Sequence, residues 1–322
     1  MIASVVWAAL GDVAHYIEPF FGSGAVLLNR PGYDPTRHTE SVCDKDGFVA
    51  NVWRAIQFSP EETAKWSDWP VNHADLCVRR AALIKNEGRL LENLIADDRW
   101  HDPVMAGYWI WAASCWIGSG LTRPNARPHL GDTGKGVHAI GKRPHLSDAG
   151  EGVHAIGQRP NLGNTGTGVH AARNENIYRW FGELSARLRY VRVVCGDWTR
   201  VCGGNWQDHS GICGMFFDPP YSVSDRDSGI YHQESLTVAQ DVGAWCRERG
   251  ENPRYRIVLA GYEDEHDLPG WRVHKWKAQG GYGNQGKGPG MENRHREQLW
   301  ISPHCFPTEQ WQAGQMSLLK NV

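Results

Sequence analysis

The segment GMFFDPPYS, residues 214–222, sets the firmest local limit on how this chain can fold. Its three apolar residues (215–217) have the composition of a buried strand. The two prolines that follow lack an amide donor and have a fixed φ, so a strand has to end there. We therefore expect a buried strand that presents Asp218 and Tyr221 at its tip.

Other apolar segments end in the same way, with an acid or a glycine turn after a strand. TESVCD ends at Asp44, YVRVVCGDW reaches Asp197, and the strand expected over 16–19 runs into FFGSG. Helices are expected between these strands, and they alternate with them along the chain. The pattern predicts an α/β fold with a Rossmann-like sheet. The remaining expected elements are helices over 25–30, 45–57, 174–188 and 234–249, and strands over 254–262, 271–278 and 297–302.

Residues 58–173 interrupt this alternation. SPEE at 59–62 is a helix start, with a cap, a proline in the first turn and acids after it, and helices are expected to about residue 93 and again over 102–117. A 16-residue repeat then fills 127–173. Its units are rich in Gly, Asp and Asn and poor in apolar residues, so we interpret them as a duplicated surface loop. The sequence predicts a discontinuous domain, 1–57 with 174–322, around an inserted region at 58–173.

Composition narrows the class of protein. The 322 residues carry a formal net charge of −2, and the eight cysteines include no CxxC pair. Scattered cysteines favour reduced thiols in a cytoplasm over disulfides or a zinc ribbon. No apolar run approaches the length of a membrane span, and the first residues lack the features of a signal peptide. We expect a cytoplasmic protein without a membrane or metal, and any nucleic-acid contact has to come from local basic patches.

The turn EPFFGSG, residues 18–24, is a candidate ligand site. Gly22 and Gly24 let the backbone approach a ligand closely where a strand becomes a helix. An acid after the next strand, such as Asp44, can accept both hydroxyls of a ribose, and Asp197 can accept the amino group of a purine. The turn lacks the phosphate-binding patterns, and Glu18 before it suits a cation. A positively charged nucleoside, S-adenosylmethionine, fits these residues.

Three segments in this order resemble the Dam-type DNA adenine-N6 methyltransferases, in particular the orphan enzymes of phages and prophages. They are YIEPFFGSGAVLL, CDKDGFVANVWRAI and FFDPPY, and the tail GYEDEHDLPGW…HREQLWISPHC resembles that group too. The resemblance implies a Rossmann-like methyltransferase sheet that uses S-adenosylmethionine. It also implies double-stranded DNA as substrate, with target recognition in the region 58–173. Nothing in the sequence implies an obligate protein partner.

The resemblance also implies roles for individual residues. Asp44 binds the ribose of the cofactor, and Asp197 with Trp198 binds its adenine. The methionine part of the cofactor lies on Glu18, Pro19, Phe20, Phe21, Gly22, Ser23 and Gly24. The site of amine methylation comprises Asp218, Pro219, Pro220 and Tyr221. Relatives usually carry an aromatic-Gly-Gly-Lys segment before the first strand, which MIASVVWAALGD does not match, so either the given sequence omits it or another basic residue replaces it.

The chemistry of an exocyclic amine explains the composition of that site. The nitrogen lone pair of adenine N6 is delocalised into the ring, so the amine is a poor nucleophile. The carboxylate of Asp218 and the carbonyl of Pro219 can accept both N–H groups and orient the lone pair. Tyr221 offers a face on which a base that has left the helix can stack. Phe20 or Phe21 can face the sulfonium of the cofactor.

Two alternatives stay open at this point. Cytosine N4 is an amine of the same kind, and the DPPY segment alone does not exclude it. The other alternative is a catalytically degenerate DNA-binding phage protein, which the near-neutral charge favours and the intact DPPY segment opposes. Candidate DNA contacts lie in 118–173 and in the Gly-rich segment 279–296. They are Arg123, Arg127, Lys142, Arg143 and Lys287.

Overall fold

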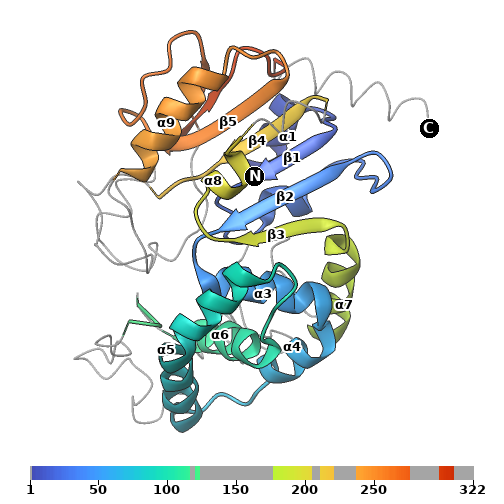
Figure 1. Cartoon of the computed structure of the whole chain (residues 1–322), viewed down its shortest axis with the longest axis vertical. Helices are drawn as coiled ribbons and strands as arrows, with labels where there is room; N and C mark the ends of the chain where they lie inside the picture. Colours follow the sequence, from blue (N-terminus) through green and yellow to red (C-terminus); the bar gives the residue numbers. More distant parts are fainter. Residues whose placement is uncertain are drawn as a thin grey trace, which may run out of the picture.

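A computed structural model describes residues 2–116, 120–123, 177–204, 211–220, 237–275 and 297–307, and it shows an α/β fold (Figure 1). The strands are β1 (His15–Glu18), β2 (Thr39–Asp44), β3 (Val191–Cys195), β4 (Cys213–Phe217), β5 (Tyr255–Tyr262), β6 (Arg272–Lys275) and β7 (Glu297–Ile301). The helices are α1 (Ile2–Leu10), α2 (Ala25–Leu28), α3 (Gly47–Phe58), α4 (Pro60–Ser67), α5 (His73–Ala96), α6 (Pro103–Cys115), α7 (Ile177–Leu188), α8 (Thr199–Cys202) and α9 (Val238–Arg249).

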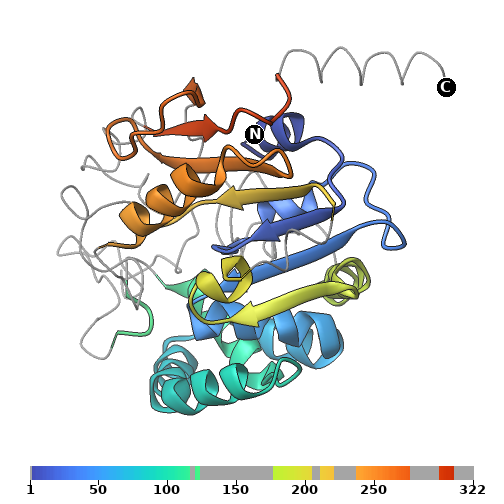
Figure 2. The ribbon, with the colours of Figure 1, turned by 45° about the horizontal axis from the view of Figure 1, so that its top comes forward.

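Within the described ranges the strands form one seven-stranded mixed sheet in the order β3-β2-β1-β4-β5-β7-β6. Strands β1 to β5 are parallel, whereas β7 runs antiparallel to both β5 and β6. The arrowheads of β1 to β4 therefore point the same way in Figure 2, and that of β7 points the opposite way. The order of the five parallel strands is that of a Rossmann-like fold, with its switch point between β1 and β4.

Both faces of the sheet are covered, and its central strands β1 and β4 are buried at every residue. Successive residues alternate between two apolar clusters. Tyr16 and Phe216 belong to the cluster that includes α1, α2, α3 and α7. Ile17 and Phe217 belong to the cluster on the opposite face, which includes α8 and α9. The Rossmann-like sheet predicted from the alternating pattern is thus compatible with the observed architecture.

Helices α4, α5 and α6 lie beyond the β3 edge in Figure 1, beside α3 and α7. Helices α4 and α6 continue the core of the sheet domain, because Ala64 of α4 and Ile110 of α6 belong to the same apolar cluster as Phe181 of α7. The buried apolar residues of α5 belong to a separate cluster, which also includes Phe48 of α3. Asn51 of α3 joins α3 to α6: its Nδ2 donates to the Asp102 carbonyl at 2.8 Å, and its Oδ1 accepts from the Asp102 amide at 2.7 Å. The 16-residue repeat expected at 127–173 lies outside the described residues.

Most of the expected elements appear near their predicted bounds, and β2 has them unchanged. Two elements were not expected. Helix α1 precedes the first strand, and its mostly buried residues cover the sheet. Helix α8 begins at Thr199, directly after the segment YVRVVCGDW, and the strand expected over that whole segment ends early, at Cys195, because Gly196 takes a φ of 136° and turns the chain. No helix in the described part of the chain is both long and apolar enough to span a bilayer.

Arg54 of α3 is the polar link between the sheet and the helices beyond its β3 edge. Its fully buried guanidinium donates from Nε to the Val193 carbonyl of β3 at 3.0 Å. Its Nη1 donates to the carbonyls of Leu94 and Asp97, at the end of α5, at 2.9 and 2.8 Å. Carbonyls that end a helix have no partner inside it, so one side chain satisfies acceptors on two elements.

We predict that Arg54→Met lowers the free energy of unfolding by about 3 kcal/mol or more, because the substitution removes the hydrogen bonds of a fully buried guanidinium to carbonyls on two elements. Urea denaturation of the variant measures this loss. Arg192→Met is the matched control: both Arg54 and Arg192 lie 3.7 Å from Asp98, but the Arg192 side chain is 55% exposed. The control should change the free energy by no more than about 0.5 kcal/mol. An equal loss in the two variants contradicts the role given to Arg54.

Candidate active site

The carboxyl ends of four adjacent parallel strands bring the predicted site residues to one edge of the sheet. Asp44 at the end of β2 is paired in register with Cys195 at the end of β3, and Ile17 of β1 with Met215 of β4. The turn after β1, the acid that ends β2 and the segments after β3 and β4 therefore lie at the same edge. In open α/β sheets this edge, at the switch point of strand order, is where ligands bind.

The glycine turn after β1 has the geometry that its sequence predicted. Gly22 and Gly24 have φ values of 48° and 67°, in the left-handed region that favours glycine. A Cβ on Gly24 would lie 2.9 Å from Phe21 Cζ and 2.9 Å from Trp53 Cζ2, so close packing also requires glycine there. The Phe21 amide donates to the Cys43 carbonyl at 2.9 Å, which fixes the turn beside β2.

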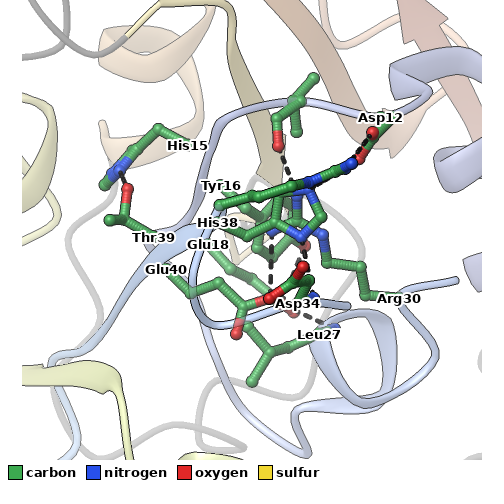
Figure 3. A network of polar contacts seen from close by, with 12 residues as sticks. Asp12, His15, Tyr16, Glu18, Leu27, Arg30, Asp34, His38, Thr39 and Glu40 are labelled. Carbon is green, nitrogen blue, oxygen red and sulfur yellow. Dashed lines mark hydrogen bonds and ion pairs between the residues drawn. The ribbon is translucent and has the colours of Figure 1, made fainter. Parts of the chain in front are cut away.

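Glu18 is the last residue of β1, and its carboxylate joins β1 to α2 (Figure 3). Its Oε2 accepts from the Tyr16 hydroxyl at 2.9 Å and from the Leu27 amide at 3.2 Å. Burial raises the pKa of Glu18 well above its usual range; these two hydrogen bonds oppose the shift, and the charge of Asp218 adds to it. The residue is only 3% exposed, so it links the strand before the turn to the helix after it from inside the fold.

A second buried acid nearby, Glu40, is compensated differently. Arg30 Nη1 lies 3.2 Å from its carboxylate and Arg187 Nη1 lies 2.7 Å from it, so two guanidinium groups share one carboxylate (Figure 3 shows Arg30 and Glu40). Glu18, in contrast, accepts from a hydroxyl and an amide, which are neutral donors. This difference explains why burial dominates the pKa of Glu18.

Asp44 fastens the glycine turn to β2. Its Oδ2 accepts from the Gly22 amide at 2.8 Å, and its Oδ1 accepts from the Asp46 amide at 2.9 Å. Desolvation, followed by the charge of Asp46, raises the pKa of Asp44 to about 7, and the two backbone hydrogen bonds oppose this shift. The carboxylate is thus both a structural anchor and a half-buried acceptor at the edge.

The segment after β3 contributes Asp197 and Trp198. The Asp197 side chain is exposed, and its Oδ1 accepts from the amide and the hydroxyl of Thr199 at 3.0 and 2.6 Å. Trp198 is 8% exposed and packs edge-on against Phe217, with 6.2 Å between ring centroids. The amide of the preceding glycine, at position 196, donates to the Asp44 carbonyl at 2.9 Å, so the tips of β2 and β3 are joined.

The strand of GMFFDPPYS ends at Phe217, as its prolines predicted. Asp218 is exposed, Pro219 is buried and Pro220 is half-buried. Tyr221 lies outside the described residues, and so do four of the five candidate DNA contacts: Arg127, Lys142, Arg143 and Lys287. The fifth, Arg123, is described; its amide donates to the Gly120 carbonyl at 3.0 Å, and its own carbonyl accepts from Arg80 of α5.

The structure separates the two phenylalanines of the turn and adds a tryptophan to it. Phe21 is 2% exposed, whereas Phe20 is only half-buried, so Phe20 is the one placed to face a ligand. Trp53 of α3 donates from Nε1 to the Gly22 carbonyl at 2.9 Å, a contact that the sequence did not predict. The two residues are 31 positions apart in the chain. The sequence indicates only that Trp53 lies on the buried face of α3, and not which atom its indole N–H contacts.

Comparisons of the chain with protein-family models and with curated proteins find no match. In the described ranges, no group of three or more His, Cys, Asp or Glu side chains is placed to hold a metal ion.

The raised pKa of Asp44 predicts a pH dependence of stability. The unfolded carboxyl titrates near 3.8 and the folded one near 7, so between these values the folded state binds more protons. The free energy of unfolding therefore falls as the pH rises through that window, with a slope of at most about 1.4 kcal/mol per pH unit from this group. Asp44→Asn cannot ionise, so we predict that its stability relative to wild type increases from pH 5 to pH 8.

Urea denaturation at several pH values measures this difference, with Asp34→Asn as the control. Hydrogen bonds from Thr36 lower the pKa of Asp34, so Asp34 stays ionised above pH 5 and its variant should show a constant difference. A constant difference for Asp44→Asn as well would contradict the raised pKa.

Proposed function

We propose that this protein is a DNA methyltransferase that transfers a methyl group from S-adenosylmethionine to the exocyclic N6 amine of adenine. One observation carries the proposal: the glycine turn, the acid after β2, the acid after β3 and the DPP segment after β4 share one edge of a Rossmann-like sheet. The strand order puts this edge at the switch point, which is where such sheets bind nucleosides.

The residues at this edge fit the cofactor. Each oxygen of Asp44 accepts one backbone amide, and a carboxylate oxygen has two acceptor positions, so the side chain retains capacity for two ribose hydroxyls. Asp197 uses its Oδ1 for Thr199, and its Oδ2 suits the amino group of adenine beside Trp198. The half-buried ring of Phe20 suits a sulfonium. When bound, the cofactor supplies an electrophilic methyl group.

The DPP segment supports the choice of an amine as acceptor. Asp218 directly follows a fully buried strand, which fixes its backbone, and its side chain is exposed and so accessible to a substrate. In the proposed reaction Asp218 and the Pro219 carbonyl accept the two amine N–H groups and orient the nitrogen lone pair. Tyr221 receives the flipped base in this proposal.

The remainder of the proposal concerns DNA. We assign residues 58–173 to target recognition on double-stranded DNA, with α4, α5 and α6 attaching that region to the sheet through Arg54 and Asn51. Arg80 of α5 supports the segment that carries Arg123, because its guanidinium donates to the Leu121 carbonyl at 2.8 Å. The fold class proposed is accordingly a Rossmann-like methyltransferase domain with an inserted recognition region.

We predict that Asp218→Ala lowers the rate of methyl transfer about a hundredfold or more, because one of two positioned acceptors is lost. Binding of S-adenosylmethionine should stay within a few-fold of wild type. Asp12→Ala is the control: that side chain is 56% exposed and pairs with Arg37 at the amino end of β1, away from the site. Transfer from methyl-labelled cofactor to DNA, followed by digestion to nucleosides and mass spectrometry, measures the effect.

The same digestion separates the alternatives. Detection of labelled N6-methyladenine supports the proposal, whereas detection of labelled N4-methylcytosine shows that the acceptor is cytosine. Unlabelled DNA together with no binding of S-adenosylmethionine favours the catalytically degenerate alternative. Asp218→Ala with wild-type activity would contradict the proposed mechanism while leaving the methyltransferase class intact.

A further inference from the structure

Gly22, in the middle of the candidate cofactor turn, is held by hydrogen bonds and not by packing. A Cβ built at this position meets no atom within 4 Å, whereas one at Gly24 meets two aromatic side chains. Gly22 is also exposed. With open space around it and no side chain, a glycine has access to many backbone conformations. Its observed φ of 48° therefore depends on the turn hydrogen bond from the Gly24 amide to the Phe21 carbonyl, at 2.9 Å, and on what the Gly22 amide and carbonyl contact.

Each of these two backbone groups has a buried or half-buried partner. The Gly22 amide donates to Asp44 Oδ2 at 2.8 Å, and the Gly22 carbonyl accepts from Trp53 Nε1 at 2.9 Å. The two partners come from different elements, β2 and α3. Both peptide groups of Gly22 are thus anchored to neighbouring elements, and loss of either contact leaves that peptide group held only by the hydrogen bond that closes the turn.

Trp53 also shapes the rest of the turn. Its ring lies 4.9 Å from the Phe21 ring, at an interplanar angle of 49°. Its Cζ2 limits position 24 to glycine, as described above. The side chain is 1% exposed, so it does not reach a ligand that lies on the outer surface of the turn.

From these contacts we infer that Trp53 is a positioning residue for cofactor binding, and the inference rests on the function proposed above. The indole holds the Gly22 carbonyl inward, which keeps the turn in the conformation that receives the methionine part of S-adenosylmethionine. Without that donor the turn samples other conformations, and binding has to select the competent fraction. Affinity for the cofactor therefore falls, although Trp53 does not touch it.

The test replaces the indole N–H at position 53 and leaves the remainder of the ring. Trp53→Phe removes the N–H donor and also reduces the volume of the side chain. Incorporation of 3-benzothienylalanine at position 53 removes only the donor, so this second variant is used if Trp53→Phe does not fold. Isothermal titration with S-adenosylhomocysteine should give a dissociation constant on the order of tenfold higher than that of wild type.

Trp111 of α6 provides a matched control. It is also 1% exposed, and its Nε1 donates to the Trp69 carbonyl at 2.8 Å, far from the turn in the chain. The same two replacements at position 111 should lower the melting temperature comparably and change the dissociation constant less than twofold. A purely structural role for Trp53 would give equal effects at the two positions.

The outcomes are distinguishable. Unchanged affinity at position 53, or an equal change at position 111, overturns the positioning role and leaves the proposed function standing. A wild-type protein that binds neither S-adenosylhomocysteine nor S-adenosylmethionine overturns the proposed function, and the positioning role with it.

Discussion

The parallel pairing of β1 with β4 is the constraint on which the rest of this structure depends. The chain leaves β1 toward β2 and β3 on one side, and the other parallel strands continue from β4 on the opposite side. The chain segments that follow β1 and β4 therefore lead away from each other, to opposite sides of this strand pair, and leave the carboxyl ends of β1 and β4 uncovered between them. The glycine turn and the DPP segment thus meet at one edge although about 200 residues of sequence separate them.

The electrostatics of this edge follow from its acids. Glu18 and Asp44 have raised pKa values because burial disfavours their charge, and Asp218 contributes to the shift of Glu18. Burial thus favours the neutral form of Glu18, and a pKa of about 7 leaves Asp44 only partly ionised at neutral pH, so neither acid is a fixed full charge.

Local features of the sequence predicted local structure well. The alternating strands and helices, the end of β4 at its prolines and the bounds of β2 follow from composition and spacing over a few residues. Contacts between distant residues had no such signal. Arg54 reaches a carbonyl 139 positions away, and the apolar helix α1 gave no indication of which face it would cover. The acids of the candidate site were found from sequence because each follows a strand, whereas Trp53 was missed because its partner is a backbone carbonyl.

A crystal structure of the protein with S-adenosylhomocysteine tests the central claim most directly, since that claim places the cofactor at the carboxyl edge of β1 to β4. The account predicts the ribose hydroxyls on Asp44, the adenine beside Asp197 and Trp198, and the homocysteine part over the turn at Gly22. A ligand bound at another place in the fold, or a turn that the ligand does not contact, would contradict it.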